Sequence, residues 1–224
     1  MYRKKDRSIT PYIEEKTLLD AGYSLIAGID EVGRGPLAGP VVAGVVMLPP
    51  NPDGDWVGEI QDSKKMTSIQ RERSYCHLRE QSIATATGIV SAEEIDQIGI
   101  APSTFLAMKR ALYTLPLQPQ YLLIDAFQLK DVNIPQKAIV KGDSLSLSIA
   151  AASIVAKVTR DRIMKDLEKV YPGYGFAKNK GYGSSEHILK LKQLGPCQIH
   201  RYSFAPIRNW TSNPGYSRTE DSKG

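Results

Sequence analysis

The apolar residues of this 224-residue chain are gathered in short runs bounded by glycine and proline. Runs of this length that are rich in valine and isoleucine are typical of buried strands. The strands expected on this basis are Ser24–Asp30, Pro40–Leu48, Ile83–Val90, Tyr121–Ala126 and Gln136–Lys141. In the second half the runs alternate with helical segments, which implies parallel pairing through βαβ crossovers. The pattern therefore predicts a mixed α/β sheet with antiparallel and parallel parts.

Helical patterns fill much of the remaining sequence. They predict helices over residues 68–80, 102–115, about 145–170 and 184–194. The longest carries small residues that would let it lie close to the sheet, namely Ala150, Ala151, Ala152 and Ala156. Residues 171–183, rich in aromatic residues, glycine and lysine, are expected to form an ordered loop. We expect one domain over residues 1–208 and a polar, disordered tail over residues 209–224.

What the sequence lacks excludes several classes of protein. The two cysteines, Cys76 and Cys197, form no CxxC pair, so we expect neither a disulfide framework nor a thiolate zinc site. No apolar run approaches the roughly 18 residues of a membrane helix, and the charged N-terminus lacks the apolar segment of a signal peptide. We therefore expect a monomeric protein of the cytoplasm with free thiols and no membrane partner.

Positive charge is concentrated in the C-terminal third of the chain. Residues 141–210 contain 12 lysine and arginine residues and 5 acidic residues, whereas residues 1–140 contain 15 and 17. Such an excess is often no more than a solvated basic face, and it is also what a polyanion-binding surface requires. Charge alone leaves both interpretations open.

Acidic residues follow three of the predicted strands. Asp30 and Glu31 end the run LIAGI, Asp125 ends YLLI, and Asp143 follows AIVKG. Two adjacent carboxylates at the end of a buried strand are costly to desolvate unless cations or hydrogen bonds compensate them. A single such pair would most often be solvated. Here three strands deliver acids at their carboxyl ends, where open α/β sheets build ligand sites.

The chemistry of these four acids favours a hard divalent cation. No cysteine or histidine accompanies them, and the scattered His77, His187 and His200 are interpreted as structural or surface residues. Carboxylates and water suit Mg²⁺ or Mn²⁺. Two such ions bridged by carboxylates are a recurrent arrangement for phosphodiester hydrolysis. Together with the basic C-terminal third this points to a nuclease, and a metal-dependent phosphatase of small substrates stays open.

The triplet Gly33-Arg34-Gly35 follows the first acidic pair within two residues. Glycines let a backbone approach a ligand closely and expose amide donors to sugar or phosphate. Most such triplets are simply turns, so its position beside predicted metal ligands is what makes this one a candidate for substrate contact.

Longer stretches of the sequence resemble a known family. Residues 28–46, GIDEVGRGPLAGPVVAGVV, are similar to the signature of type 2 ribonucleases H, specifically bacterial ribonuclease HII. The motifs continue in the family's order through DSKK at 62–65, LID at 123–125, KGD at 141–143, AASIVAK at 151–157, KGY at 180–182 and HRYSF at 200–204. Arg34 and the short N-terminus favour this subtype over ribonuclease HIII. The resemblance implies a ribonuclease H-like fold, with a mixed five-stranded sheet flanked by helices and a small helical, substrate-binding part over about 171–208.

The resemblance also implies roles for individual residues. The family's metal-site acids fall on the four residues that the strand ends selected, Asp30, Glu31, Asp125 and Asp143. The implied cofactors are Mn²⁺ or Mg²⁺, two ions per site. Recognition of a ribonucleotide 2′-hydroxyl would fall on Gly33, Arg34, Gly35 and Tyr182. Further contacts to phosphate or within the active site would fall on Lys64, Ser153 and Lys157.

The implied reaction is hydrolysis of the RNA strand of RNA–DNA hybrids, and nicking on the 5′ side of single ribonucleotides embedded in duplex DNA. It would leave 3′-hydroxyl and 5′-phosphate ends and serve ribonucleotide removal in replication or repair. Two alternatives stay open at this point. Another two-metal nuclease of the ribonuclease H-like superfamily would need the acids but not the GRG and KGY motifs, and a non-catalytic RNA–DNA binding module would need no turnover.

Overall fold

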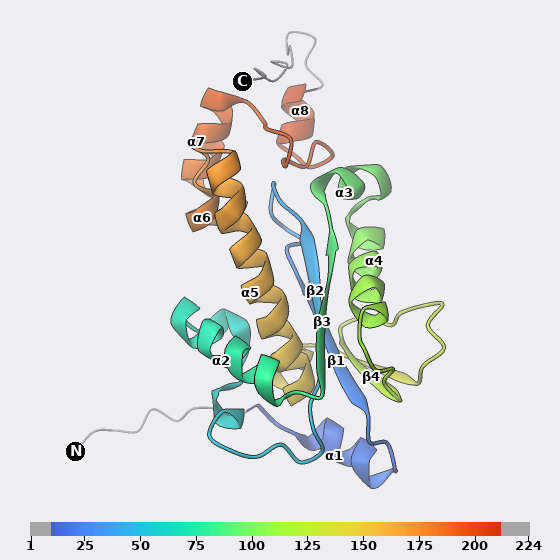
Figure 1. Ribbon diagram of the computed structural model, residues 1–224. Helices are drawn as coiled ribbons and strands as arrows, with labels where there is room; N and C mark the ends of the chain where they lie inside the picture. Colours follow the sequence, from blue (N-terminus) through green and yellow to red (C-terminus); the bar gives the residue numbers. More distant parts are fainter. Residues whose placement is uncertain (1–9, 212–224) are drawn as a thin grey trace, which may run out of the picture.

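The computed structural model describes residues 10–211, which build one five-stranded sheet with helices on both faces (Figure 1). The strands are β1 Ile26–Val32, β2 Val41–Met47, β3 Ala84–Val90, β4 Tyr121–Asp125 and β5 Gln136–Ile139. Their order across the sheet is β3-β2-β1-β4-β5. β1, β2 and β3 pair antiparallel, whereas β1, β4 and β5 pair parallel. The predicted mixed sheet is therefore confirmed, with its five strands where the apolar runs placed them.

Eight helices are present in the described residues. They are α1 Ile13–Asp20, α2 Ser68–Gln81, α3 Ala92–Ile98, α4 Ile100–Tyr113, α5 Leu147–Val170, α6 Phe176–Asn179, α7 Ser185–Leu194 and α8 Ile207–Thr211. The sequence pattern predicted α2, α4, α5 and α7 and did not predict the others. α6 lies inside the expected ordered loop. Of the tail expected from residue 209, the first three residues belong to α8 and the rest lies outside the described residues.

The long helix α5 lies directly on one face of the sheet because glycines on the strands give it room. A Cβ built on Gly28 of β1 would stand 2.1 Å from the backbone carbon of Ser148, and one built on Gly44 of β2 would stand 2.4 Å from the Ala152 oxygen. The alanines that the sequence singled out on this helix are fully buried there. Backbone-to-backbone contact of this kind fixes α5 against the strand that carries Asp30.

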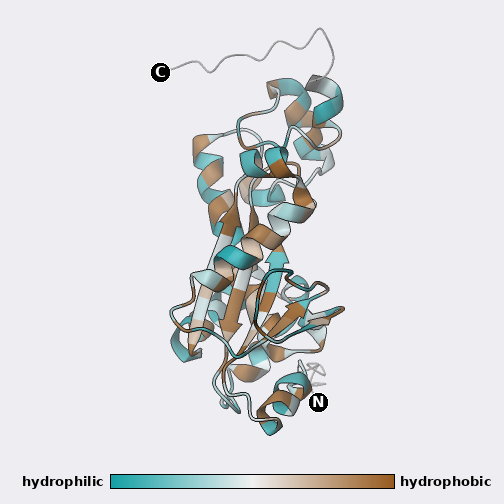
Figure 2. Ribbon diagram, turned by 90° about the vertical axis from the view of Figure 1, so that its right-hand side faces the viewer, coloured by the Kyte–Doolittle hydropathy of each residue, from teal (hydrophilic) through white to brown (hydrophobic). Residues whose placement is uncertain are grey.

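The opposite face of the sheet is covered by α4, whose Ala107, Met108 and Ala111 are fully buried. In Figure 2 the strands accordingly carry much of the apolar colour, while apolar and hydrophilic residues alternate along the helices. On the α5 face, α1 holds the start of the long helix, because Glu15 Oε1 accepts hydrogen bonds from Ser146 Oγ at 2.5 Å and from the Ser148 N–H at 2.8 Å. Both faces of the sheet are thus fixed by buried contacts.

The C-terminal helices α6, α7 and α8 gather with the far end of α5 beyond one end of the sheet (Figure 1). They share an apolar cluster with Leu37 and Ala38, which follow β1 in the sequence. The chain between β1 and β2 is therefore held by residues some 160 positions later, as in the contact from the Arg201 N–H to the Leu37 oxygen at 2.8 Å. Across residues 10–211, none of the helices is both long and apolar enough to span a bilayer.

Candidate active site

The four predicted acids meet at the carboxyl ends of β1, β4 and β5. β1 and β4 run parallel and pair Ile29 with Ile124, so Asp30 and Asp125 come next at matching positions. Asp143 lies in the 3-10 turn η3, Gly142–Ser144, just after β5. The Gly142 N–H donates to Asp125 Oδ1 at 2.8 Å and ties that turn to the end of β4. The topology thus brings together acids that are up to 113 positions apart in the sequence.

Burial and like charge perturb these carboxyl groups. Desolvation raises the pKa of Asp30 well above its usual value, and the neighbouring Glu31 and Asp125 carboxylates raise it further. Burial also raises the pKa of Glu31, with the Arg34 guanidinium opposing that change and Asp125 adding to it. Desolvation raises the pKa of Asp125, and the nearby Asp143 carboxylate raises it further. The hydrogen bond from the Gly142 N–H opposes this change. Negative charge is therefore crowded at this edge of the sheet.

A divalent cation suits the chemistry of this cluster. All its ligand atoms are carboxylate oxygens, and Glu31 Oε2 is buried without a hydrogen-bond partner. In their present positions, no three His, Cys, Asp or Glu side chains of residues 10–211 surround a common point closely enough to hold an ion. Protein donors occupy several of the oxygens instead, including Asp30 Oδ1, which accepts from the Glu31 N–H at 2.7 Å. The donor set fits a metal, and side-chain rotation would be needed to complete its coordination.

Two of the three additional residues implied by the resemblance contact this cluster. Lys64, in the 3-10 turn η2 Ser63–Lys65, places its ammonium nitrogen 2.9 Å from Asp143 Oδ2. Burial lowers the pKa of Lys64, but the hydrogen bond and charge of Asp143 outweigh it and raise that pKa overall. Ser153 of α5 is buried, donates to the Asp30 carboxylate and lies 2.7 Å from the Ser63 hydroxyl.

Lys157 stands apart from this arrangement. It lies one helical turn beyond Ser153 on α5, but its ammonium nitrogen is 2.7 Å from Asp161 Oδ1. Asp161 also lies 3.8 Å from the Arg71 guanidinium. In the structure Lys157 is therefore engaged in a largely buried ion pair along α5 rather than with the four acids.

The triplet Gly33-Arg34-Gly35 and Tyr182 come together beside the acids. Gly33 has φ +94°, and a Cβ on it would stand 2.3 Å from the Arg160 Nε, so this turn requires glycine. A Cβ on Gly35 would lie 3.9 Å from the Tyr182 ring. Tyr182 is 45% exposed, so its ring is available to a ligand. The Arg34 guanidinium lies 5.0 Å above the Phe127 ring and 3.4 Å from Glu31 Oε1, between the triplet and the acids.

Sequence reasoning assigned no role to two fully buried arginines behind this triplet. Arg160 of α5 donates to the backbone oxygens of Ala38, Pro40 and Lys180. Arg201 donates to those of Gly33, Arg34 and Gly39. Arg201 belongs to the HRYSF motif, and that membership was the one signal in the sequence that it has a role. Its backbone partners could not be read from a one-dimensional pattern.

The fold brings two of the scattered histidines together as a buried pair. His187 and His200 lie with their Nε2 atoms 3.2 Å apart, and His187 Nδ1 is 2.8 Å from the Tyr182 oxygen. Burial lowers the pKa of both, that of His200 to about 3, where the neighbouring His187 contributes. They are neutral structural residues near physiological pH, as the sequence interpretation had it, although they are not scattered in space.

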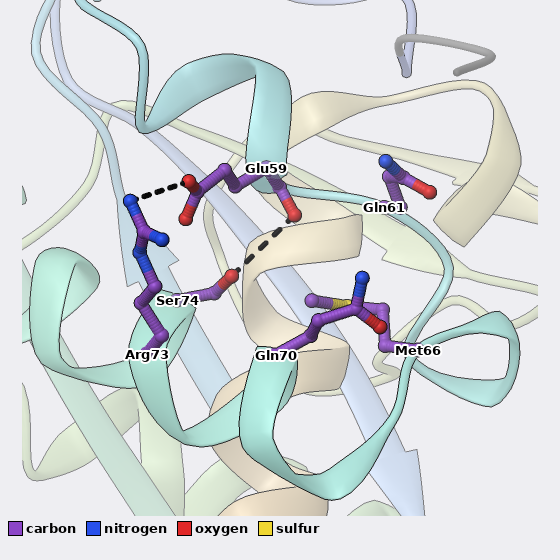
Figure 3. Close-up of a pocket in the computed structure, with 6 residues that line it drawn as sticks. All are labelled: Glu59, Gln61, Met66, Gln70, Arg73 and Ser74. Atoms are coloured by element: carbon purple, nitrogen blue, oxygen red, sulfur yellow. Dashed lines mark hydrogen bonds and ion pairs between the residues drawn. The ribbon is translucent and has the colours of Figure 1, made fainter. Parts of the chain in front are cut away.

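A small hollow of about 80 Å³ lies between α2 and the segment before it (Figure 3). The Glu59 carboxylate faces the Arg73 guanidinium across it at 2.8 Å, and the Ser74 hydroxyl donates to the Glu59 backbone oxygen at 3.4 Å. Glu59, the acid that lines the hollow, is paired with Arg73, and none of the four strand-end acids lines the hollow. The hollow is therefore separate from the acid cluster.

Comparisons with known proteins agree with this geometry. A family model described as Ribonuclease HII matches residues 27–207. A ribonuclease HII of Dehalococcoides mccartyi is 52% identical over 198 residues, which cover 88% of this chain and 94% of the relative. A ribonuclease HII of Enterococcus faecalis is 52% identical over 87% of this chain and 75% of its own length. The crystal structure of ribonuclease H2 from Pyrococcus horikoshii superimposes with a TM-score of 0.70 at 28% identity, covering 83% of this chain and 96% of that one.

Proposed function

This chain belongs to the ribonuclease HII family and is a ribonuclease H enzyme with the ribonuclease H-like fold, and from that premise we propose how it acts. The proposed reaction is hydrolysis of the RNA strand of RNA–DNA hybrids and nicking on the 5′ side of single ribonucleotides in duplex DNA. The products would carry 3′-hydroxyl and 5′-phosphate ends. The observation that carries the proposal is the meeting of four strand-end acids with the glycine triplet and Tyr182 at one edge of the sheet.

Asp30, Glu31, Asp125 and Asp143 would hold the divalent ions, with Mn²⁺ or Mg²⁺ as the expected species. When bound, a pair of such ions activates water and stabilises the leaving oxygen in phosphodiester hydrolysis. The protein's own contribution is to hold the acids in place. The Gly142 N–H orients Asp125, and the Ser153 hydroxyl orients Asp30. Lys64 supplies positive charge beside Asp143, where a phosphate would approach.

Sugar recognition is assigned to the surface next to the acids. The Arg34 and Gly35 N–H groups donate no hydrogen bond within the described part of the chain, so they are free to meet a ligand oxygen. The half-exposed Tyr182 ring lies against Gly35. A 2′-hydroxyl is the group that separates RNA from DNA, and it is both donor and acceptor. Backbone donors beside an aromatic ring fit that group. Lys157, which is paired with Asp161, remains a predicted contact to phosphate or within the active site.

The test is cleavage of a DNA duplex that contains one ribonucleotide, compared with the same duplex made entirely of DNA. The expected result with Mg²⁺ or Mn²⁺ is one nick 5′ of the ribonucleotide and none in the all-DNA duplex. Asp125→Asn should abolish the nick, because it removes one carboxylate from the cluster. Tyr182→Ala should reduce nicking at the lone ribonucleotide and leave metal binding intact.

Each alternative function has its own signature in this experiment. Metal-dependent cleavage of the all-DNA duplex would indicate another nuclease of the same superfamily. Binding that weakens with salt, without any cleavage, would indicate a non-catalytic binding module, because contacts to phosphate make binding salt-dependent. A nick unaffected by Tyr182→Ala would remove Tyr182 from the recognition of the sugar.

A further inference from the structure

Arg201 contacts the glycine triplet, Gly33-Arg34-Gly35, through the carbonyl groups of its first two residues. Its Nη2 donates to the Gly33 oxygen at 2.6 Å and its Nη1 donates to the Arg34 oxygen at 2.9 Å. Nε and Nη2 also donate to the Gly39 oxygen, at 3.0 and 2.8 Å. One planar guanidinium thus binds both ends of the turn that links β1 to β2. The side chain is fully buried, so it does not touch the substrate itself.

The planarity of the peptide bond converts these contacts into an orientation of N–H groups. In a trans peptide the C=O and the following N–H point in opposite directions. Because the Gly33 oxygen points to Arg201, the N–H of Arg34 must point away from it. Because the Arg34 oxygen also points to Arg201, the N–H of Gly35 points away as well. Neither of these two N–H groups has an acceptor in the described residues.

Burying the Arg201 guanidinium costs desolvation free energy, which indicates that this residue has a function that outweighs that cost. No carboxylate in residues 10–211 lies within 4.0 Å of its guanidinium, and the nearby Arg160 is equally buried. Desolvation, together with the charge of Arg160, lowers the pKa of Arg201 to about 9. Removing a donor from buried acceptors is costly, so the hydrogen bonds of Arg201 also stabilise the turn. All of these bonds go to backbone oxygens of the turn, so the same contacts that stabilise it also fix its orientation.

A second contact aligns the triplet with Tyr182. The Leu37 N–H donates to the Gly181 oxygen at 2.8 Å, and Arg160 joins the Lys180 oxygen to those of Ala38 and Pro40. The Tyr182 ring and the free N–H groups consequently belong to one bonded unit. Within that unit Arg201 is the residue that sets the direction of the N–H groups, whereas Arg160 holds the two segments together.

We propose that Arg201 is a positioning residue for sugar discrimination: by binding the Gly33 and Arg34 carbonyls it presents the Arg34 and Gly35 N–H groups to the 2′-hydroxyl. This inference rests on the proposed function. Arg201→Lys keeps the positive charge but cannot bind two carbonyls through a rigid fork. It should therefore disturb the triplet's orientation while leaving the phosphate-binding surface in place.

The test measures equilibrium binding to two duplexes of the same sequence, one all-DNA and one with a single ribonucleotide, in a chelator so that no cleavage occurs. The preference of wild type for the ribonucleotide duplex should fall at least fivefold in Arg201→Lys, with affinity for the all-DNA duplex changed less than twofold. Met108→Ala serves as the matched control, because it removes a buried side chain on the opposite face of the sheet and lowers stability without touching the triplet.

The possible outcomes separate the two proposals. If wild type prefers the ribonucleotide duplex and folded Arg201→Lys keeps that preference, the role of Arg201 is refuted and the proposed function stands. Equal weakening on both duplexes also refutes it, because that result describes a general structural effect. If wild type shows no preference, reading of the 2′-hydroxyl is itself wrong and the inference about Arg201 fails with it.

A measurement on wild type keeps the inference testable if Arg201→Lys does not fold. Amide hydrogen exchange of Arg34 and Gly35 should be fast in the free protein, because their N–H groups have no internal acceptor in the described residues. The ribonucleotide duplex should slow it at least fivefold more than the all-DNA duplex does. Equal protection by the two duplexes, or slow exchange in the free protein, would contradict the orientation that we assign.

Discussion

The Lys64 ammonium nitrogen lies 2.9 Å from Asp143 Oδ2. This contact joins η2, which carries Lys64, to η3, which carries Asp143. The two partners differ in exposure, since the lysine side chain is 76% exposed and the aspartate side chain 7%. A largely exposed lysine loses little when it leaves such a pair, because solvent screens the interaction. We therefore expect Lys64 to compete with a metal ion for Asp143, which is one of the proposed ligands.

Lys64→Met should strengthen metal binding by the free protein. Without the ammonium group, Asp143 is free to coordinate, so the Mn²⁺ concentration that gives half-maximal thermal stabilisation should fall by roughly twofold to fivefold, in keeping with the modest energy of an exposed pair. Thermal melts across a Mn²⁺ titration measure this. Lys65→Met is the matched control, because Lys65 pairs with Asp62 at 3.8 Å rather than with the acids. An equal shift in both variants would mean that only the net charge matters.

Metal removal should lower the stability of the enzyme, because the acids then repel one another without compensation. At a metal concentration about 100 times Kd the stabilisation is about 2.7 kcal/mol, which corresponds to a Tm increase of roughly 5–10 °C for a chain of this size. Asp125→Asn should remove most of this increase and should not lower Tm in chelator, since it relieves like-charge repulsion. Asp166→Asn, an exposed acid on α5, should respond to metal as wild type does. A Tm unaffected by millimolar metal would contradict the metal site.

Most of the sheet could be predicted from the sequence because each strand is an apolar run with a clear end. The convergence of Asp30, Asp125 and Asp143 followed from the same pattern, since parallel strands bring their carboxyl ends to one edge. The triplet was a candidate because it follows the first acidic pair, and the resemblance added Tyr182. The structure places the triplet and Tyr182 side by side. The roles that it implied for these residues remain predictions.

Other features could not be predicted because they depend on contacts between distant segments. α1 has a polar sequence, and its place is fixed by the hydrogen bonds of Glu15 to the start of α5. Arg201 meets Gly33 across 168 positions, and no periodicity reports a side chain bound to backbone oxygens. The pairing of His187 with His200 depends likewise on the packing of α7 against the residues that follow it.

Gly28→Ala should strongly destabilise the enzyme through α5. The added methyl group would stand 2.1 Å from the Ser148 backbone, and backbone atoms of a buried helix cannot yield as a side-chain end can. Overpacking typically costs about 1–3 kcal/mol, and this contact should reach the upper end of that range or exceed it. Urea unfolding measures the loss. Gly58→Ala is the control, because nothing lies within 4 Å of its added Cβ, and it should change stability by less than about 0.5 kcal/mol.

The buried pair His187 and His200 should make the enzyme less stable in acid. Burial lowers the pKa of folded His200 to about 3, whereas an unfolded histidine titrates near 6.5. Between these values the unfolded chain binds more protons, so stability is full above about pH 6.5 and falls as the pH drops toward 3. At pH 5 the loss from His200 should be about 2 kcal/mol. Asp30, Glu31 and Asp125 act in the opposite direction, because their pKa values are raised by folding.

His200→Asn separates these opposing effects, because it removes one titrating ring and leaves the acids unchanged. The variant should be less stable than wild type at pH 7.5, having lost the contact with His187. Its stability should depend less on pH, so the difference between the two proteins should narrow by about 2 kcal/mol between pH 7.5 and pH 5. Urea unfolding at both pH values provides the comparison. A difference that stays constant with pH would show that the His200 ring titrates in the folded enzyme as it does in the unfolded chain.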